Sequence, residues 1–248
     1  MRKIIFGGLI VLTQTAWSML VFVKGGSFIP LYGSVKKPVI ISDFEIDEFP
    51  VTNKEFLTFV KANSEWQASK AKKIFVDKSY LNHWTNDLTL GPRSLSDAPV
   101  VNVSWFAAKA YCENRSLRIP TVNEWEYIAS REIKGMNISK LILDWYSQPT
   151  PEFLPSVHTG IKNIYGIAAL HGLIWEWTLD FNSAMVTGES RGDSALDKSL
   201  YCGAGSAGAA NPEDYAAFMR FAYRSSLKAK YTVNNLGFRC VKERGNIK

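Results

Sequence analysis

The sequence predicts one α+β domain after residue 18, built from short strands, a few helices and long loops. Three observations lead to this prediction. Capping-box residues precede apolar positions at helical spacing in two places, Thr52 to Glu55 and Thr121 to Glu124. Short apolar or alternating runs between polar stretches indicate strands of a few residues each. The chain lacks internal repeats and low-complexity linkers, so residues 19–248 are expected to form a single domain.

The first strands and the first helix are expected between residues 19 and 63. Residues 19–28 form an apolar run that the glycine pair at 25 and 26 interrupts. Residues 41–47 alternate between apolar and polar side chains, which is typical of a strand, and Pro50 ends it. The capping box at Thr52 then predicts a helix over residues 53–63.

The middle of the chain is expected to contain a long loop, a strand and two helices. Residues 64–98 are polar and irregular, which indicates a surface excursion. Residues 98–105 predict a short strand that leads to Ser104, whose hydroxyl is placed to cap a helix over 105–115. The second capping box predicts another helix, which ends near Ser130.

The last third of the chain is expected to be mostly loop with two strands. Residues 131–162 lack a regular apolar period and are predicted to be a loop. A strand that follows places Trp175 and Trp177 on one face and Glu176 on the other. Residues 231–242 predict a closing strand.

The first 18 residues have the three parts of an export signal. Arg2 and Lys3 precede the apolar run IIFGGLIVL, and small residues follow around Ala16 and Ser18. The apolar run is too short for a membrane span, which needs about 20 residues. We expect cleavage near Ser18 and a periplasmic or secreted product, and a buried first strand is the alternative. No later segment of the sequence is apolar and long enough to predict a membrane span.

Charge and composition exclude two classes of protein. The formal net charge is +6, without a block of like charges. Nucleic-acid-binding domains cluster Lys and Arg with interleaved aromatic residues, so no nucleic-acid partner is expected. The chain is 46% hydrophobic and has eight tryptophans, so it can build a substantial core and is not disordered.

Three cysteines occur, at Cys112, Cys202 and Cys240. Their spacing excludes a zinc knuckle and a CxxC redox pair. An exported protein is folded under oxidising conditions, so we expect one long-range disulfide and one odd thiol.

Several segments in a fixed order resemble a known family. They are GGSF at 25–28, DFEIDEFPVTNKEFLTFV at 43–60, APVVNVSWFAAKAYC with LRIPTVNEWEYIA across 98–129, NIYGIAALHGLIWEWT from 163, and the terminal NNLGFRC. Together they resemble the formylglycine-generating enzyme, or sulfatase-modifying factor, family. The resemblance covers residues 19–242 and implies a C-type-lectin-like fold with little regular secondary structure. It implies less about function, because one fold hosts many activities.

The resemblance implies copper chemistry whose ligands this sequence lacks. Catalytic family members bind copper through two cysteines near the C-terminus and oxidise a substrate cysteine to formylglycine, since soft thiolates hold Cu(I). A Gly-Ser turn at 203–206 and the arginines at 220 and 224 locate the corresponding segment. The cysteine positions fall at Ala209 and Asp214 counted from the turn, or at Asn211 and Ala216 counted from the arginines. Neither count finds a sulfur, so copper and formylglycine-generating activity are not expected.

The resemblance also implies a cysteine pairing. The family joins the cysteine of its AYC helix to the cysteine of GFRC, which here are Cys112 and Cys240. Such a bridge closes a loop of more than a hundred residues and contributes about 4 kcal/mol in the chain-entropy model. Two buried free thiols are the alternative, and Cys202 is expected to be a lone, inert thiol.

A calcium ligand at Glu176 is a further implication of the resemblance. The backbone carbonyls of Gly172 and Ile174 would join it. The family places an Asn oxygen at the position of Ala169, whose methyl group cannot bind the ion. A carboxylate between two tryptophans needs a partner, and an arginine is the alternative to calcium. The candidates are Arg118 and Arg239.

Residues 203–225 are expected to line a binding groove. The segment opens with Gly, Ala and Ser and ends on two arginines. Small side chains at the emptied copper segment would leave space for a peptide or a small ligand. The expected polar lining consists of Ser206, Asp214, Arg220 and Arg224.

We therefore expect an exported accessory or binding protein whose ligand is an unidentified peptide or small molecule. The alternative is a periplasmic enzyme, similar to relatives implicated in pyoverdine maturation, that modifies a bound precursor without copper thiolates. Such an enzyme would use Ser206, Asp214 or Arg224 in acid–base or electrostatic roles. A third hypothesis is a ligand-displaying lectin-like module.

Overall fold

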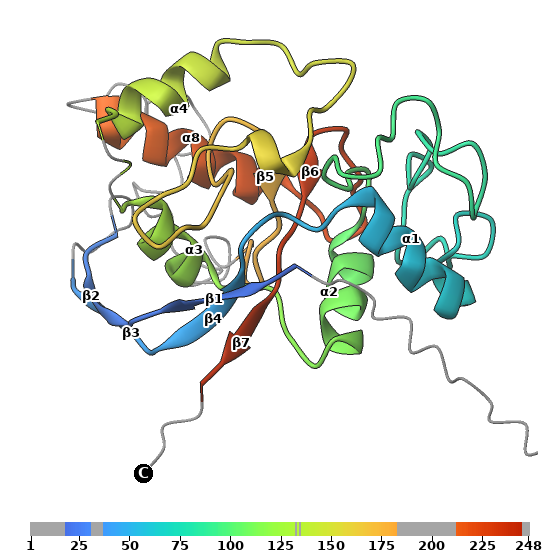
Figure 1. Cartoon of the computed structure of the whole chain (residues 1–248), viewed down its shortest axis with the longest axis horizontal. Helices are drawn as coiled ribbons and strands as arrows, with labels where there is room; N and C mark the ends of the chain where they lie inside the picture. Colours follow the sequence, from blue (N-terminus) through green and yellow to red (C-terminus); the bar gives the residue numbers. More distant parts are fainter. Residues whose placement is uncertain (1–17, 31–36, 132, 134, 183–211, 245–248) are drawn as a thin grey trace, which may run out of the picture.

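An antiparallel sheet of three short strands joins the two ends of the domain (Figure 1). In the computed structural model its order is β1 (Leu20–Val23), β4 (Phe44–Asp47) and β7 (Val241–Glu243). The structure describes residues 18–30, 37–131, 133, 135–182 and 212–244. The predicted signal, residues 1–18, lies outside these ranges except for Ser18. The C-terminal strand thus pairs with a strand from the first fifth of the chain, so the fold depends on long-range contacts.

Two further sheets in the described ranges have two strands each. β2 (Gly26–Phe28) pairs antiparallel with β3 (Val39–Ile41), and β5 (Trp175–Glu176) pairs parallel with β6 (Leu236–Gly237). The prediction of one strand over 41–47 is wrong, because Ile41 ends β3 and Phe44 begins β4 in another sheet.

The chain passes from the β1-β4-β7 sheet to the β2-β3 sheet at Gly25, which lies between β1 and β2. A Cβ atom there would lie 2.1 Å from the carbonyl oxygen of Ile41, so the close approach requires glycine. The backbone N–H of Gly25 donates a hydrogen bond of 2.8 Å to the Asp43 carboxylate. Ser42 and Asp43 belong to neither strand and separate β3 from β4, which interrupts the apolar alternation.

Three helices begin at the residues that their capping signals predicted. They are α1 (Asn53–Ala62), α2 (Trp105–Asn114) and α3 (Val122–Ala129). At α1 the Thr52 hydroxyl accepts from the Glu55 N–H at 3.2 Å, and the Glu55 carboxylate accepts from the Thr52 N–H at 2.8 Å. Thr121 and Glu124 repeat this arrangement at α3, and Ser104 caps α2. Both predicted capping boxes and the Ser104 cap are confirmed.

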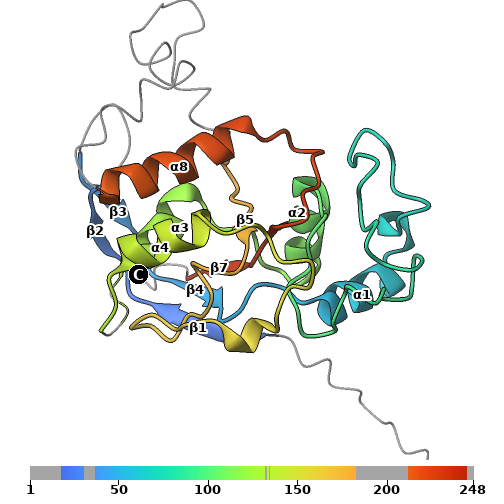
Figure 2. The ribbon, with the colours of Figure 1, turned by 90° about the horizontal axis from the view of Figure 1, so that it is seen from above.

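Two helices lie where loops were predicted. They are α4 (Ile138–Tyr146) and α8 (Pro212–Ser226), and they pack against each other (Figure 2). The loop prediction for 131–162 is wrong over α4, where the Asn137 side chain caps the helix. Residues 138, 141, 142 and 145 of α4 are apolar, which is a helical stripe. α8 begins with a proline, which is favoured at the first helical position because its missing N–H is not needed there.

Residues 64–98 contribute to the core, which differs from the predicted surface excursion. After the short 3-10 helix η1 (Ser64–Trp66) the segment runs through turns. Val76, Tyr80, Leu81 and Trp84 from these turns are nevertheless buried. These large apolar side chains pack in one cluster with the side chains of α1. Their spacing in the sequence is irregular, so no helical or strand period indicated that they would be buried. Together α1 and this segment form one side of the molecule, away from the β1-β4-β7 sheet (Figures 1 and 2).

Residues 98–105 do not form the predicted strand. Their backbone is extended, and its hydrogen bonds go to separate segments: Val100 N–H donates to Val51 and Asn102 N–H donates to Val233, at 2.8 and 3.0 Å. Asn102 has a φ of 53°, which breaks any strand at this point. The segment therefore lies between α1 and the C-terminal residues rather than in a sheet.

The main hydrophobic cluster lies between α1, α2 and the C-terminal segment. Phe56 stacks on Tyr111 with ring centroids 5.8 Å apart, and Tyr111 meets the edge of Phe238 at 5.3 Å. Cys112 and Cys240 are joined within this cluster by a disulfide, and both are 0% exposed. The predicted bridge is confirmed and the alternative of two free thiols is not, while Cys202 lies outside the described residues.

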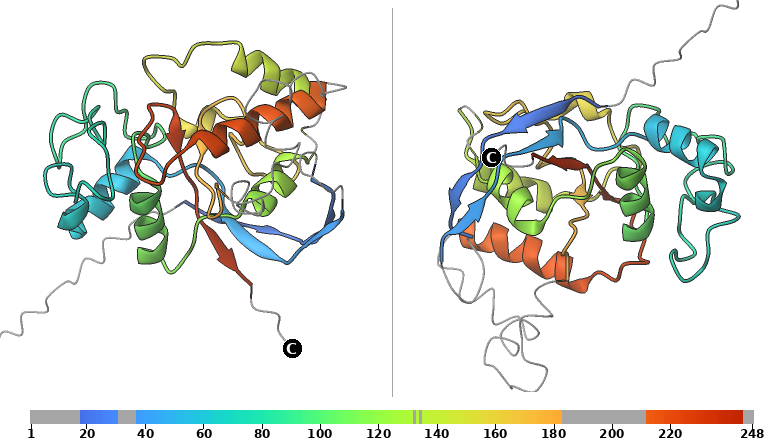
Figure 3. Two further views of the ribbon diagram at one scale, coloured as in Figure 1. Left: turned by 180° about the vertical axis from the view of Figure 1, so that it is seen from behind. Right: turned by 90° about the horizontal axis from the view of Figure 1, so that it is seen from below.

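Among the described residues, the remaining helical element is η2 (Val157–Thr159), a short 3-10 turn on the segment that leads to β5. α4 and α8 lie above the β1-β4-β7 sheet, with α3 nearby (Figure 3). Within the part of the chain that the structure describes, every helix is too short or too polar to cross a bilayer.

Candidate functional site

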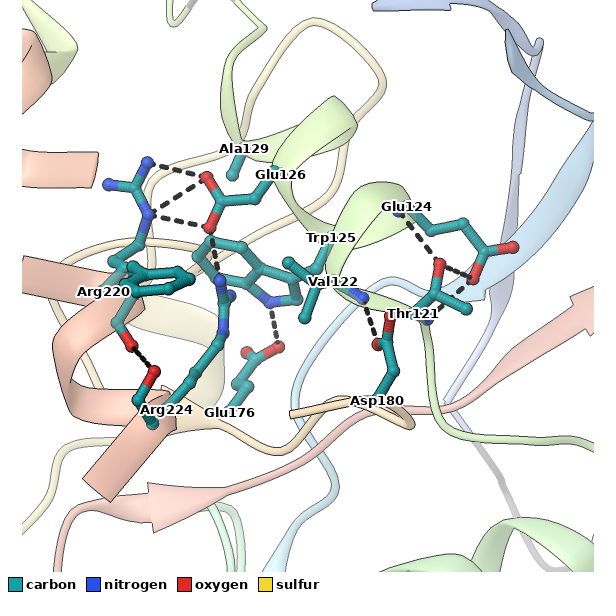
Figure 4. Close-up of polar contacts among 12 residues, drawn as sticks. Thr121, Val122, Glu124, Trp125, Glu126, Ala129, Glu176, Asp180, Arg220 and Arg224 are labelled. Atoms are coloured by element: carbon teal, nitrogen blue, oxygen red, sulfur yellow. Dashed lines mark hydrogen bonds and ion pairs between the residues drawn. The ribbon is translucent and has the colours of Figure 1, made fainter. Parts of the chain in front are cut away.

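Helices α3 and α8 meet at a carboxylate, Glu126 (Figure 4). Arg220 Nη2 lies 2.7 Å from Glu126 Oε2, and Arg224 Nη1 lies 2.6 Å from Glu126 Oε1. The two arginines are four residues apart, so one face of α8 presents both guanidinium groups. These charge-assisted hydrogen bonds hold α8 against α3.

Burial and charge compete at this cluster. Burial favours the neutral form of Glu126, but the charges and hydrogen bonds of Arg220 and Arg224 outweigh it and lower the pKa of Glu126 to about 2. Burial likewise opposes the charge of Arg220, yet Glu126 outweighs it and raises the pKa of Arg220. Arg224 also lies over the Trp125 ring, 4.9 Å from its centroid. Glu126 and Arg220 are therefore ionised at neutral pH.

This arrangement corrects the predicted groove lining. Arg220 and Arg224 were expected to present their charge to a ligand, but they are 6% and 7% exposed and bind Glu126. An electrostatic role for Arg224 toward a substrate is not favoured, because its guanidinium group is buried and bonded to Glu126. Ser206 lies outside the described residues, and Asp214 falls in the part of α8 whose side chains the structure does not describe. The structure thus does not bring the four predicted residues together.

Glu176 is the carboxylate of a second, fully buried ion pair. Arg239 donates to both of its oxygens, from Nε at 2.8 Å and from Nη2 at 2.7 Å, and both side chains are 0% exposed. The Trp125 indole N–H donates to the same carboxylate at 2.8 Å, as Figure 4 shows. The arginine alternative is therefore correct, with Arg239 as the partner. Arg118 instead pairs with Glu124 at 2.6 Å.

These residues do not fit a calcium ion. Calcium binds several oxygen atoms that are free to surround it, and a guanidinium group already bonds both oxygens of Glu176. A second cation beside Arg239 would be repelled in this buried position. Ala169 provides no side-chain oxygen in place of the family's Asn. The predicted site at Glu176, Gly172 and Ile174 is therefore corrected to a protein ion pair.

A groove of about 720 Å³ lies elsewhere on the molecule, where four separate segments meet. The loop after α1, the extended residues before α2, the segment before η2 and the residues before β6 form its walls. Polar side chains predominate in the lining, among them Ser79, Asn82, His83, Asn102, Thr232 and Asn234. The charged lining residues are Arg93 and Glu152, which pair with each other at 2.9 Å. The groove is therefore polar, with its two charges compensated.

Two residues beside the groove have strained backbones. Leu81 has a φ of 50° and Asn102 a φ of 53°, a conformation that leucine rarely adopts. Their backbones are joined, since the Leu81 N–H donates to the Asn102 carbonyl at 3.0 Å. The Asn102 side-chain amide in turn donates to the Asn82 carbonyl oxygen at 2.8 Å. Strain of this kind is often found at functional sites. Here Asn102 itself and Asn82, the neighbour of Leu81, both line the groove.

His83 adds a neutral imidazole to this wall. Burial lowers the pKa of His83 to about 4, so the ring is uncharged at neutral pH. Its Nε2 atom is buried and has no hydrogen-bond partner among the described residues. An unpaired buried nitrogen costs free energy, and functional sites are places where such a cost is tolerated.

The sequence did not reveal these groove residues. They come from segments around residues 80, 102, 150 and 233, and no short motif connects them. Asn tolerates a positive φ, and this was the available local signal. It also places Asn in ordinary turns, so it did not indicate a groove. Only the long-range bonds between these segments bring them together.

Known proteins resemble this chain over most of its length. A family model described as the sulfatase-modifying factor enzyme 1-like domain matches residues 11–244. The inactive C-alpha-formylglycine-generating enzyme 2 of Mus musculus is 28% identical over 260 residues, which cover 86% of this chain and 79% of that protein. The formylglycine-generating enzyme of Streptomyces coelicolor is 28% identical over 273 residues, 83% and 80% of the two chains.

A solved structure is similar to this chain in fold. The Treponema denticola variable protein 1 superposes with a TM-score of 0.50 over 90% of this chain and 94% of that one, at 14% identity. At this identity the likeness concerns the fold alone. Together with the family model, it agrees with the α+β C-type-lectin-like domain that the sequence predicted.

Proposed function

The chain belongs to the sulfatase-modifying factor family, and on this basis we propose that it is an exported protein that binds an extended peptide segment without converting cysteine to formylglycine. The proposed ligand is a stretch of polypeptide whose backbone N–H and C=O groups are unpaired. The proposed site is the groove that contains Asn82, Asn102 and Asn234.

The chemistry of the groove wall is the observation that supports a peptide ligand. Each carboxamide side chain offers two N–H donors and an oxygen that accepts, which matches the donor and acceptor of a peptide unit. Every residue of an extended peptide needs both kinds of partner. The groove volume of about 720 Å³ is within the usual range for ligand sites. Its compensated charges favour a neutral backbone over a highly charged ligand.

The sequence supports the absence of formylglycine chemistry. The positions that correspond to the copper cysteines are Ala, Asn or Asp in either count, and none of these provides a thiolate for Cu(I). The relative in Mus musculus carries the word inactive in its name, so family members without the activity are known. A binding role is therefore the simpler proposal for this chain.

Export to the periplasm or the exterior is supported by two features. The apolar run after Arg2 and Lys3 has the pattern of a secretory signal. The disulfide between Cys112 and Cys240 is stable in the oxidising compartments that such a signal leads to.

Selection from a random linear-peptide display library tests the proposed function. We expect the purified protein to select peptides with micromolar Kd values, measured by fluorescence anisotropy of the labelled peptides. The double variant Asn82→Ala, Asn234→Ala should weaken their binding at least tenfold. Both side chains are exposed, and the substitution removes one hydrogen bond from Asn102 to Asn82, so the fold should remain intact with a small loss of stability, which the melting temperature checks.

The matched control is Asn86→Ala, which removes an exposed carboxamide outside the groove. Its peptide affinity should equal that of the wild type. The proposal would be wrong if no peptide is selected above background, or if the groove variant and the control bind the selected peptides equally well.

A further inference from the structure

A second, smaller cavity adjoins the groove. Its volume is about 140 Å³, and Thr150 and Pro151 line both spaces. The cavity lies against the strand β5 and against α4 and α8, the two helices that were not predicted from the sequence. Trp145, Tyr146 and Trp175 supply its aromatic lining.

The aromatic wall is rigid before any ligand arrives. Trp175 is stacked between Tyr146, whose centroid lies 4.9 Å away at an interplanar angle of 16°, and Tyr223, at 4.2 Å and 24°. The Trp145 ring also contacts this stack, with its centroid 5.3 Å from that of Trp175 and 5.3 Å from that of Tyr146. Because these rings hold one another, a ligand does not have to order them, and the entropic cost of binding is small.

The size of the cavity suits one aromatic ring. An apolar cavity of roughly 150 Å³ is large enough to bind benzene. Leu173 and Met219 complete the apolar lining, and the Met219 thioether can adapt its shape to a ring. The polar residues Gln148 and Asn235 also line the cavity, and the Asn235 amide donates to the Thr150 hydroxyl at 3.0 Å. A ring with a hydroxyl group would therefore find polar partners.

Charge argues against a cationic occupant. The described residues that line the cavity are uncharged. A lysine or arginine side chain would lose its hydration on entering, and these lining residues provide no carboxylate to compensate its charge.

We propose that this cavity receives the ring of a tyrosine or phenylalanine from the peptide that lies in the adjoining groove. The peptide ligand in this inference rests on the proposed function. The preference for an aromatic ring rests on the cavity itself. A residue whose backbone passes Thr150 and Pro151 can direct its side chain between α4 and α8. The cavity thereby selects one residue of the ligand, while the amide side chains of the groove bind its backbone.

Binding of p-cresol, the side-chain analogue of tyrosine, tests the ring site without any peptide. Saturation-transfer NMR and quenching of tryptophan fluorescence measure its affinity, which we expect to be roughly millimolar for a fragment of this size. Trp145→Ala removes a wall and Met219→Trp fills the cavity, so each should weaken p-cresol at least fivefold. n-Butylammonium, the analogue of lysine, should neither bind nor compete.

Two controls isolate the cavity. Phe153→Ala removes an aromatic residue that is 52% exposed and outside the cavity, and it should bind p-cresol as the wild type does. The groove variant Asn82→Ala, Asn234→Ala should also bind it unchanged. Equal p-cresol affinity in Met219→Trp and the wild type, or competition by n-butylammonium, overturns the ring site.

Peptides then separate this inference from the proposed function. In a selected peptide, replacing its aromatic residue by Ala should weaken binding at least tenfold to the wild type but less than twofold to Met219→Trp. Peptides that bind the groove without any aromatic preference support the proposed function and overturn the ring site. Binding of p-cresol in the cavity with no peptide selected supports the ring site and overturns the proposed function.

Discussion

Replacing Glu176 by Gln is expected to destabilise the protein strongly while leaving the shape of the side chain almost unchanged. Three hydrogen bonds end on the Glu176 carboxylate, two from Arg239 and one from the Trp125 indole, all between 2.7 and 2.8 Å. The substitution removes the negative charge and turns one acceptor into a donor that faces the Arg239 guanidinium. Arg239 would then be a buried cation without a counter-ion.

The cost follows from the inability of Arg239 to reach water. It is 0% exposed, and its remaining N–H groups donate to the backbone carbonyls of Asp47, Glu48 and Ala168. Removing one partner of such a buried pair costs about 3 to 5 kcal/mol of unfolding free energy. For a domain of this size that loss corresponds to a melting temperature lower by about 6 to 20 °C.

Denaturation in guanidinium chloride followed by circular dichroism measures this loss, and scanning fluorimetry gives the melting temperature. Glu243→Gln is the matched control, because Glu243 also pairs with an arginine but is 74% exposed, and it should cost at most about 1 kcal/mol. EDTA should leave the wild-type melting temperature unchanged. The reasoning would be refuted if Glu176→Gln costs no more than the control, or if calcium raises the melting temperature of the wild type but not of Glu176→Gln.

Two other predictions concern the disulfide and acid stability. Cys112→Ala with Cys240→Ala opens a bridge between residues 128 apart and should lower the unfolding free energy by about 4 to 5 kcal/mol, measured in guanidinium chloride. Cys202→Ser should have no effect, and a loss under about 1 kcal/mol in the double variant would contradict the prediction. Burial, with the charge of Arg220 beside it, lowers the pKa of His171 from 6.5 to about 4. Between pH 6.5 and about 4 the unfolded chain therefore binds more protons than the folded chain, and stability should fall as the pH drops through this range. His171→Gln, compared with the exposed His158→Gln in urea, should remove up to about 3 kcal/mol of that pH dependence, and equal pH profiles in the two variants would contradict it.

Local signals in the sequence predicted the helix starts correctly. A capping box involves residues three apart, so Thr52 with Glu55 and Thr121 with Glu124 contain all the information that α1 and α3 need to begin. The pairing of Cys112 with Cys240 was also predicted, but from the family resemblance rather than from the residues themselves.

The two missed helices had local signals that were weaker. α4 has nine residues, a length at which an isolated helix is not stable, although Asn137 and an apolar stripe mark it. α8 begins at Pro212 directly after a run of small residues, which resembles a loop. Packing of each helix against the other stabilises both, and this contact between residues far apart in the sequence could not be read from either segment alone.

The sequence by itself determined the family, the fold class and the first three helices. Each of these depends on residue identity or on neighbours within one helical turn. The tertiary structure decided which charges meet: Glu126 with the two arginines of α8, and Glu176 with Arg239 rather than with calcium or Arg118. It also decided where the groove and the aromatic cavity lie. Opposite charges attract any partner of the right sign, so only the folded chain, through the distances it imposes, selects one partner among many.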